Sequence, residues 1–486
     1  MLNLQFQYKQ STFSPCLSAG RFLIFHFLFL IVLTSCSVEK QIAKSAKADV
    51  LHAKPLQTAH VGISIFDPAA NKYLYNYQGD KYFVPASNIK IPTCYAAMKY
   101  LGDSLVGIRY YIENDSSVII NPTGDPTFLH DDFKSQLVFD FLKKEKRGIY
   151  ISDDNWKDEA LGSGWAWNDY NESYMAERSP FPVTANIVKF YFKYFPTIGR
   201  GSLSFFPSYF EKQNNSFSIK LMNAIGHFVN VHNIKNEDSV ALFSIKRDRR
   251  NNQFELVKTK TPFLRQEIPF ATDTLKTAVE ILKNDYNLKI TIIPNDLISS
   301  IGYSKDNYTN NNYIIHSQPT DSLLKPMMHR SDNFFAEQSL LMVSNERLGV
   351  MNDAKIIDTL LKTDFKDLPQ KPRWADGSGL SRYNLFTPQD FVAILNKMKN
   401  EFGMERLKVI LPTSGEGTIS SYYKADSGYI YGKTGTLSGV VAFSGFLYTK
   451  KGKLLIFSTL VNNHQDSATE VRKAMEKFLQ GIRNNY

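Results

Sequence analysis

Apolar residues alternate or run together near both ends of the chain, and these patterns predict strands. Residues 61–66 are largely apolar, residues 67–71 form a turn cluster, and residues 73–77 read as the returning strand. Near the other end, residues 440–449 and 453–461 predict two further neighbouring strands. Both ends of the chain are therefore expected to contribute strands to one domain.

Three other segments have the periodicity of helices. Ser87 opens an apolar helical pattern that ends at Gly102. Residues 333–345 predict a second helix, and residues 468–482 predict an amphipathic one. Strands at both ends with helices between them predict an α/β (α+β) domain with a large insertion in its middle. Residues 116–315 are mixed and rich in Asn, Phe and Tyr, and their elements are not assigned.

The start of the chain reads as a secretory signal. Basic residues precede an apolar run at 22–32, which is too short for a comfortable membrane span. The run leads into Leu-Thr-Ser-Cys36, which resembles the lipobox of bacterial lipoproteins, in which the cysteine is lipidated. A plain signal anchor with an incidental cysteine is the alternative. We expect residues 1–36 to be a lipoprotein signal peptide and the polar residues 37–55 to be a tether.

Composition excludes several classes of protein. The 486 residues are 43% hydrophobic and 21% charged, which excludes a disordered chain, a collagen-like chain and a multi-span membrane protein. A formal net charge of +10 suits an anionic partner such as a nucleic acid, a membrane surface or an acidic polymer, without choosing among them. Three cysteines are too few for a disulfide-stapled fold. The sequence has no zinc signature, so we expect neither a metal nor another cofactor.

The first motif that carries chemistry is Ser-x-x-Lys at Ser87 and Lys90. Positions i and i+3 lie on one face of a helix, so the lysine can take the serine proton if the pKa of its ammonium group is lowered. The positive end of the helix dipole favours that shift. Ser-x-x-Lys occurs four times in the chain, about as often as chance allows, but only Ser87 follows a turn and begins an apolar helix.

The second motif is Ser331-Asp332-Asn333. A hydroxyl and an amide two residues apart can point into one cleft. Ser, Asp and Asn are also the residues that cap helix N-termini, and both roles are compatible. Taken alone, the motif favours the helix cap.

The third motif is Lys433-Thr434-Gly435-Thr436, which precedes a strand-like run. Gly435 would let a ligand approach the backbone closely. Lys433, Thr434 and Thr436 would supply hydrogen-bond donors for a carboxylate. A polar edge before a strand explains this motif equally well when it is considered alone.

In this chain order the three motifs are the signature of penicillin-binding proteins and serine β-lactamases. The sequence most resembles the class C, low-molecular-mass penicillin-binding proteins, which are DacB-type D-alanyl-D-alanine carboxypeptidases and endopeptidases. The resemblance runs from about residue 60 to 480, with a weak middle. The 244 residues between Ser87 and Ser331 separate the chain from β-lactamases, whose interval is far shorter, and imply inserted accessory domains.

Further segments fit the pattern of this family. They include a Gly-Asp-Pro turn and a Trp-x-Trp segment, and together they are residues 85–88, 124–127, 164–169, 331–337, 376–382, and 411–412 with 417–418. The arginine that often follows the last Gly-Thr pair is absent here. We expect residues 56–115 and 316–486 to form a transpeptidase-like catalytic domain, with an antiparallel sheet flanked by helices. Residues 116–315 would form the inserted accessory region.

The resemblance implies a covalent serine mechanism. Ser87 would attack the carbonyl of a D-Ala-D-Ala bond or of a D-Ala–diamino-acid cross-link, with Lys90 as the base. The backbone N–H groups of Ser87 and Thr436 would bind the oxyanion. Ser331 would relay a proton to the leaving amine, and Lys433 would hold it in place electrostatically.

The other motif residues would bind the substrate. Asn333 would bond to the substrate amide, while Thr434 and Thr436, on either side of Gly435, would bind the terminal carboxylate. β-Lactams mimic the dipeptide and would inhibit, because their acyl-enzymes are slow to hydrolyse. Asp376 and Ser378 fit a Gly-Ser-Gly turn better than a place in the cleft.

We therefore expect a serine D-Ala-D-Ala carboxypeptidase or DD-endopeptidase that acts on peptidoglycan peptides, with no nucleic-acid partner. A lipid on Cys36 would anchor it to a membrane of the cell envelope, facing the periplasm of a Gram-negative bacterium. Two alternatives stay open: a β-lactamase or esterase of the same superfamily, and a non-catalytic cell-wall-binding lipoprotein. The sequence does not separate carboxypeptidase from endopeptidase activity, nor does it give the oligomeric state or the stem-peptide specificity.

Overall fold

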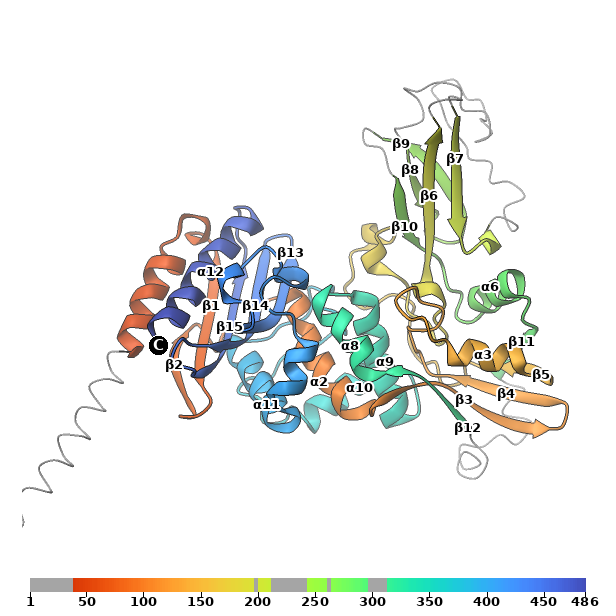
Figure 1. The fold of residues 1–486 in the computed structure, drawn as a ribbon, viewed down its shortest axis with the longest axis horizontal. Coiled ribbons are helices and arrows are strands. Elements are labelled where there is room, and N and C mark those ends of the chain that lie inside the picture. The colour runs from red at the N-terminus through yellow and green to blue at the C-terminus, as the bar shows by residue number, and fades with distance from the viewer. Residues whose placement is uncertain (1–37, 196–199, 211–242, 260–263, 296–312) are drawn as a thin grey trace, which may run out of the picture.

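The structure is a computed structural model that describes residues 38–195, 200–210, 243–259, 264–295 and 313–486. Figure 1 shows two bodies side by side, one containing both ends of the described chain and the other built from the middle of the sequence. The predicted signal peptide and Cys36 lie outside the described residues. Within the described ranges, no helix has both the length and the apolar character that a membrane span requires.

The first body is organised around a five-stranded antiparallel sheet that both chain ends build, as predicted. Its strand order is β13-β14-β15-β1-β2. β1 pairs with β15 from His60 opposite Asn462 to Phe66 opposite Ile456. The strands are β1 (His60–Asp67), β2 (Lys72–Tyr77), β13 (Ile430–Leu437), β14 (Val440–Tyr448) and β15 (Leu454–Asn462).

Helices cover both faces of this sheet, so its central strands are apolar along almost their whole length. One face packs against α11, and the helices that carry the first two motifs belong to the same apolar cluster. The other face packs against α12. The helices of this body are α2 (Lys90–Tyr100), α8 (Thr320–His329), α9 (Asn333–Leu348), α10 (Asp353–Lys362), α11 (Pro388–Ile410) and α12 (Ala468–Asn485).

The expected tether at residues 37–55 is wrong for the part that the structure describes. Residues 38–51 are helical, ending in the π-turn η1 (Lys47–Leu51), and they pack against α12. Ile42, Ala46 and Val50 are buried in this contact. Because these three apolar residues recur every four positions, they line one face of the helix and hold it to the body.

The two ends of the described chain also meet through polar contacts. The hydroxyl of Tyr486 donates to the carbonyl of Val38 at 2.7 Å. Lys477 on α12 pairs with Asp49 at 2.9 Å. The first helix is therefore part of the first body and not a spacer in front of it.

The described part of the second body contains three further sheets. Their strand orders are β11-β5-β4-β3-β12, β10-β6-β7 and β8-β9. The elements are β3 (Ser104–Asn114), β4 (Ser117–Pro122), α3 (Leu137–Lys144), β5 (Gly148–Ile151), β6 (Ile187–Phe195), β7 (Arg200–Phe206), β8 (Phe243–Arg247), β9 (Phe254–Lys258), β10 (Arg265–Pro269), α6 (Lys276–Tyr286), β11 (Ile290–Ile292) and β12 (Tyr313–Pro319).

The borders of the inserted region lie nearer the catalytic motifs than residues 116 and 315. β3 and β12 run antiparallel side by side, so the chain leaves the first body and returns to it at one place. Both strands belong to a sheet of the second body, which puts the borders near Gly102 and Thr320. Local sequence patterns do not predict these borders, because β3 pairs with a strand about 200 residues away.

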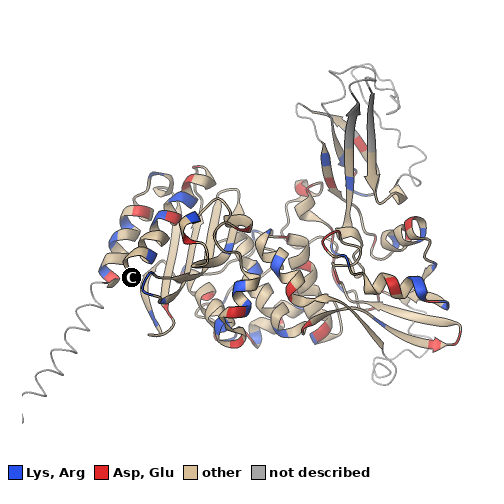
Figure 2. Ribbon diagram, viewed as in Figure 1, with Lys and Arg blue, Asp and Glu red and all other residues tan. Residues whose placement is uncertain are grey.

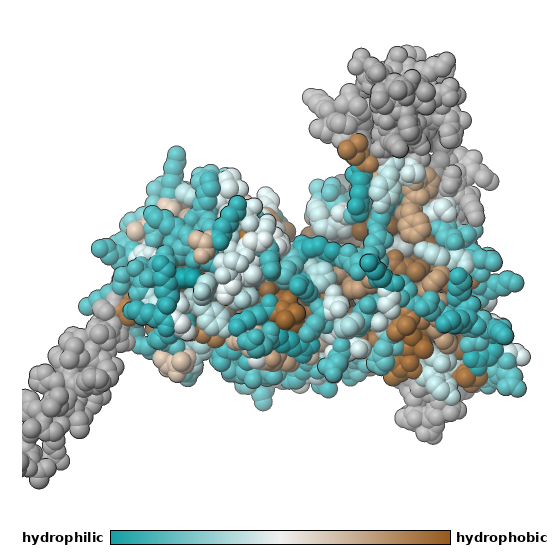
Figure 3. Space-filling view, viewed as in Figure 1, coloured by the Kyte–Doolittle hydropathy of each residue, from teal (hydrophilic) through white to brown (hydrophobic). Residues whose placement is uncertain are grey.

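The excess of basic residues, +10 over the full sequence, is not gathered in one region of the view in Figure 2. Figure 2 shows both signs of charge spread over both bodies. In Figure 3 the first body is mostly hydrophilic on this side, and most of the apolar patches lie on the second body.

Candidate active site

Ser87 lies on a short 3-10 turn, η3 (Ala86–Ile89), that leads directly into α2. The predicted helix thus begins as a tighter turn. Ala86 just before it has a φ of 48°, a left-handed conformation that costs a non-glycine residue about 1–3 kcal/mol. The surrounding packing must hold this conformation in place.

Two glycines allow neighbouring segments to touch this nucleophile turn. A Cβ on Gly435 would lie 2.7 Å from the carbonyl oxygen of Pro85 and 3.0 Å from the backbone nitrogen of Ser87. A Cβ on Gly379 would lie 1.9 Å from the carbonyl oxygen of Ala86. The third motif and the 376–382 segment therefore meet the first motif backbone to backbone.

Lys90 is the first residue of α2 and is fully buried. Its Nζ lies 3.1 Å from Ser87 Oγ, 2.6 Å from Asn333 Oδ1 and 2.8 Å from the carbonyl oxygen of Ser378. The last two atoms only accept hydrogen bonds, so each takes one N–H of the amine. A neutral amine has two N–H groups and one lone pair, and the lone pair then faces Ser87.

The surroundings of Lys90 raise the fraction of the amine that is neutral. Burial lowers the pKa of Lys90 from 10.5 to about 8, although the carboxylates of Asp376, Glu337 and Asp332 oppose the shift. At pH 7, a pKa of 8 leaves about one amine in ten neutral, against roughly one in 3,000 for an ordinary lysine. Burial, together with the charge of Lys90, holds the pKa of Lys433 well below its usual range.

The second motif divides its two predicted roles between its residues. Asp332 is the N-cap of α9, and its side chain accepts from a backbone N–H of the first turn at 3.0 Å. Asn333 joins the site: its Oδ1 accepts from Lys90 and its Nδ2 donates to the carbonyl of Tyr174 at 2.9 Å. Ser331 precedes the helix with a φ of 61°. The hydrogen bond to Ser87 Oγ comes from Lys90 and not from Ser331.

A cavity of about 390 Å³ opens beside these residues. Ser331 and Asn333 lie at its border. Tyr174, on the 3-10 turn η5 (Ser173–Met175), lines it from the second body. The cavity therefore gives a bound molecule room between the two bodies, next to the second motif. The aspartate, glutamate, lysine and arginine residues that line it are Asp131, Asp132, Lys189, Arg265, Glu267, Arg330 and Asp332.

The third motif lies on β13, an edge strand of the first sheet. Lys433 is fully buried, and its Nζ donates to the carbonyl of Thr434 at 2.7 Å. Thr434 and Thr436 are two residues apart, so their side chains share the opposite strand face. The hydroxyl of Thr434 also donates to that of Thr418 at 2.6 Å. The strand thus presents two hydroxyls beside the nucleophile turn.

Arg472 on α12 is a site residue that the sequence did not reveal. Its Nη2 donates to the hydroxyl of Thr436 at 2.6 Å, and its guanidinium packs over the ring of Tyr422. No carboxylate in the described part of the chain forms an ion pair with it. A guanidinium beside two hydroxyls suits a carboxylate ligand. No local pattern in α12 connects Arg472 with β13.

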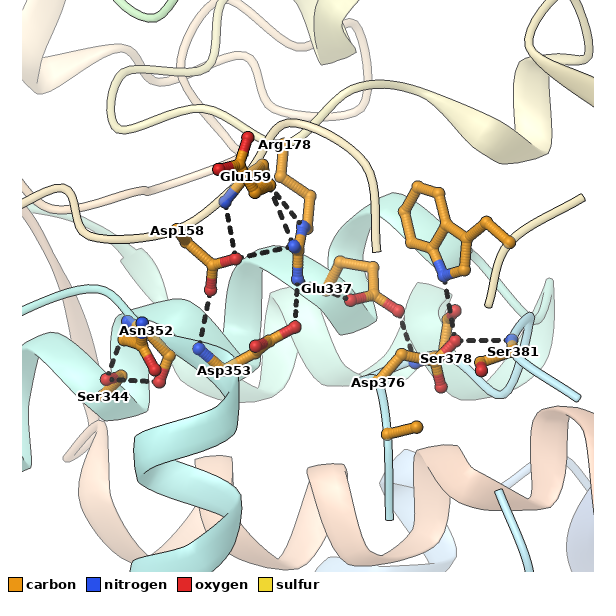
Figure 4. A network of polar contacts seen from close by, with 12 residues as sticks. Asp158, Glu159, Arg178, Glu337, Ser344, Asn352, Asp353, Asp376, Ser378 and Ser381 are labelled. Carbon is orange, nitrogen blue, oxygen red and sulfur yellow. Dashed lines mark hydrogen bonds and ion pairs between the residues drawn. The ribbon is translucent and has the colours of Figure 1, made fainter. Parts of the chain in front are cut away.

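A buried polar network behind Lys90 was also missed (Figure 4). Glu337 accepts from the backbone N–H of Ser378 at 2.7 Å. Figure 4 shows Arg178, from the second body, between Glu337 and two aspartates. Its guanidinium bonds Asp158 at 2.7 Å and Asp353 at 2.6 Å.

Asp376 belongs to a turn, as the sequence favoured. Its carboxylate accepts from the backbone N–H groups of Gly379 and Ser381 and from the side chains of Asn384 and Trp165. The same turn nevertheless contacts Lys90, through the carbonyl of Ser378 described above. Across the described ranges, no three His, Cys, Asp or Glu side chains are grouped as a metal ion would need.

Two curated relatives are similar over most of their length. D-alanyl-D-alanine carboxypeptidase DacB of Haemophilus influenzae is 23% identical over 463 residues, covering 88% of this chain and 90% of that protein. A D-alanyl-D-alanine carboxypeptidase of Actinomadura sp. is 25% identical over 455 residues, covering 86% of this chain and 80% of that protein.

The crystal structure of penicillin binding protein 4 (dacB) from Haemophilus influenzae has a similar fold. The TM-score is 0.62 at 18% sequence identity, with 91% of this chain and 98% of that chain covered. This likeness confirms the predicted fold class. The model of the D-Ala-D-Ala carboxypeptidase 3 (S13) family matches residues 44–213 and 271–482, which is most of the chain. The motif order, the fold and this match agree, and the chain belongs to the D-Ala-D-Ala carboxypeptidase 3 (S13) family.

Proposed function

We propose that this family member is a serine peptidase that hydrolyses the bond after D-Ala in peptidoglycan peptides, with Ser87 as its nucleophile. It acts as a D-alanyl-D-alanine carboxypeptidase, as a DD-endopeptidase, or as both. One observation carries the assignment: the buried Nζ of Lys90 lies 3.1 Å from Ser87 Oγ while its other hydrogen bonds go to fixed acceptors.

Acylation begins when the neutral amine of Lys90 takes the proton of Ser87 Oγ. The oxygen attacks the carbonyl carbon, and the negative charge moves to the carbonyl oxygen. The N–H groups of Ser87 and Thr436 bind this oxyanion, and the close approach that Gly435 permits brings the two donors together. An oxyanion donor of this kind contributes about 2.7–4 kcal/mol to the transition state.

The intermediate then collapses and the C–N bond breaks. Ser331 passes its proton to the leaving amine and receives in turn the proton that Lys90 took from Ser87, while Lys433 holds Ser331 in place electrostatically. D-Ala leaves from a stem peptide, or the amine of a second stem leaves from a cross-link. Lys90, neutral again, takes a proton from a water whose oxygen attacks the ester on Ser87. The ester bond breaks, the proton returns to Ser87 Oγ, and the shortened peptide is released as a carboxylic acid.

Substrate binding uses the residues around this centre. Thr434 and Thr436 bind the terminal carboxylate, and the positive charge of Arg472 lies next to them. Asn333 has one Nδ2 hydrogen engaged with Tyr174, which leaves the second hydrogen for the carbonyl of the substrate amide. Asn333 thus orients both the base and the peptide.

A penicillin tests the nucleophile directly. Protein starting after Cys36 is incubated with a penicillin, and the intact mass is recorded for the wild type and for Ser87→Ala. We expect a one-to-one adduct on the wild type and none on Ser87→Ala. Ser322→Ala is the matched control, because Ser322 begins another Ser-x-x-Lys sequence but is exposed on α8. It should keep the adduct.

Other outcomes would favour the alternatives. An adduct on Ser87→Ala would refute the nucleophile. Rapid consumption of the drug without an adduct would indicate a β-lactamase. Folded wild type that leaves the drug intact would indicate a cell-wall-binding protein without catalysis. Digestion of cross-linked muropeptides then separates endopeptidase activity, which yields monomers, from carboxypeptidase activity, which releases free D-Ala.

We also propose that the protein is exported and anchored in the cell envelope through a lipid on Cys36, facing the periplasm. The basic and apolar segment that ends at Cys36 supports this. Cys36→Ser should move the protein from the membrane fraction to the soluble fraction. Cys16→Ser, in the same leader, should not. Membrane retention of Cys36→Ser would contradict the lipid anchor.

A further inference from the structure

We infer that Glu337 is a positioning residue for the base: it holds the backbone of Ser378, whose carbonyl accepts from Lys90, and Arg178 of the inserted region balances its charge. The inference rests on the proposed function, since it concerns the base of that reaction. No motif role was assigned to Glu337 or Arg178 from the sequence.

Hydrogen bonds connect Glu337 to Lys90 through the backbone of a single residue, Ser378. Glu337 Oε1 accepts from the N–H of Ser378 at 2.7 Å, and the carbonyl of Ser378 accepts from Lys90 Nζ at 2.8 Å. A hydrogen bond to a carboxylate is strong in a low-dielectric interior, so Glu337 fixes the position of the Ser378 backbone. The direction of the lone pair on Lys90 therefore depends on where Glu337 holds Ser378.

The peptide is also packed so that it has little freedom. A Cβ on Gly377 would lie 2.7 Å from the carbonyl oxygen of Ala336, so this segment rests directly on the backbone of α9. The hydroxyl of Thr93 on α2 donates to the carbonyl of Gly377 at 2.7 Å. Together with Glu337, these contacts tie the helix that carries Lys90 to the helix that carries the second motif.

The inserted region supplies the positive charge behind Glu337. Arg178 and Glu337 are each 1% exposed, and Arg178 Nη1 lies 3.6 Å from Glu337 Oε2. Asp158 and Asp353 bind the same guanidinium more closely. Three carboxylates thus share one buried cation, and Glu337 is the one of the three that also contacts the Ser378 peptide.

The charges around Lys90 come from every element that packs on it. They are Lys433 on β13, Asp332 and Glu337 at α9, Asp376 in the turn, and Arg178 with Asp158 and Asp353 behind Glu337. Burial and the nearby Asp376 raise the pKa of Glu337 to about 8, against the opposing charge of Arg178. The pKa of Lys90 is also about 8, and the charge of Glu337 acts on it, so the two protonation equilibria are coupled.

The test compares three variants of the full mature chain. Glu337→Gln keeps an oxygen for the Ser378 N–H and removes the charge, whereas Glu337→Ala removes both. Glu346→Gln is the matched control. Glu346 lies on the same helix and forms a two-pronged ion pair with Arg109 of the inserted region at 2.7 and 2.8 Å, but it does not contact the catalytic groups. The rate constant for acylation by a fluorescent penicillin is measured from pH 5.5 to 10, together with the unfolding temperature.

We expect the pH midpoint of acylation in Glu337→Gln to fall by about half a unit or more, because a carboxylate no longer raises the pKa of Lys90. The pH profile of acylation in Glu337→Gln should also be steeper around its midpoint, because only one of the two coupled groups still titrates. Glu337→Ala should acylate about 10- to 100-fold more slowly than the wild type, as expected for loss of a buried hydrogen bond to a charged group. Glu346→Gln should have the wild-type midpoint.

A wild-type midpoint and width in Glu337→Gln would overturn the inference. The inference would also be overturned if, at equal stability, the acylation rate of Glu337→Ala fell no further than that of Glu346→Gln. If Glu337→Ala does not fold, the isosteric Glu337→Gln decides alone. Failure of the proposed function looks different, because then the wild type itself forms no adduct on Ser87.

Discussion

Gly435→Ala tests whether β13 must touch the nucleophile turn. The added Cβ would lie 2.7 Å from the carbonyl oxygen of Pro85, 3.0 Å from the backbone nitrogen of Ser87 and 3.1 Å from the Cβ of Ala86. All of these are main-chain atoms or a short methyl group, so no flexible side chain can move aside. The turn is also in contact with Gly379, and β13 is held in register by β14.

The structure gives the size of the effect. Relaxing the contact with Pro85 from 2.7 Å to an ordinary 3.4 Å separates the strand from the turn by about 0.7 Å. That gap lies between Ser87 and Thr436, the two proposed oxyanion donors. An oxyanion that keeps only one donor reacts about 10²- to 10³-fold more slowly. We therefore expect acylation of Gly435→Ala to fall by about that factor, with a smaller loss of stability.

The assay is the rate of acylation by a fluorescent penicillin, with the unfolding temperature measured on the same sample. Gly481→Ala, on α12, is the control. A Cβ there approaches only the flexible hydroxyl of Ser45, at 3.3 Å, and no atom of the nucleophile turn. Gly481→Ala should acylate like the wild type. Acylation of folded Gly435→Ala within about threefold of the wild type would refute the reasoning, since the loss of a donor predicts far more.

Three further predictions follow from the site and the fold. Between pH 5 and 7, the acylation rate should rise about tenfold per unit, because only the neutral form of Lys90, whose pKa is about 8, takes the proton; a flat profile would exclude it as the base. Arg472→Ala should raise KM for a D-Ala-D-Ala peptide about tenfold through loss of a charged hydrogen bond near Thr436, and should leave a C-terminally amidated peptide unaffected. Ile42→Ala should lower the free energy of unfolding by about 2–5 kcal/mol in chemical denaturation with no change in acylation, whereas an unchanged value would mean that the first helix is not docked in solution.

The sequence predicts the first body well because its signals are local. Continuous apolar runs match β1, β14 and β15, and the helix pattern after Ser87 matches η3 and α2 to within a residue or two. The spacing of Ser87 and Lys90 leads directly to their 3.1 Å contact. Short-range periodicity is enough to predict a helix or strand that buries one face, because the pattern does not depend on which apolar neighbour covers that face.

The rest depends on contacts that no local pattern encodes. The strand pairing of β3 with β12, and the approach of Arg178 to Glu337, join segments more than 150 residues apart. The helix at residues 38–51 is a different case, because a signal was present. Ile42, Ala46 and Val50 recur every four positions, which is typical of an amphipathic helix, but the lysines between them led to the prediction of a polar tether.

The pairing of β1 with β15 has a consequence for how the protein forms. These two central strands are about 400 residues apart in the chain, so the sheet cannot close until the last segment has been synthesised. Until then, the β1–β2 hairpin exposes an apolar surface with no partner. Contacts of such long sequence separation slow folding and leave unfinished states open to aggregation. The inserted body has its own sheets and its own core, so it is the part that can assemble first and act as a scaffold on which the two catalytic ends meet.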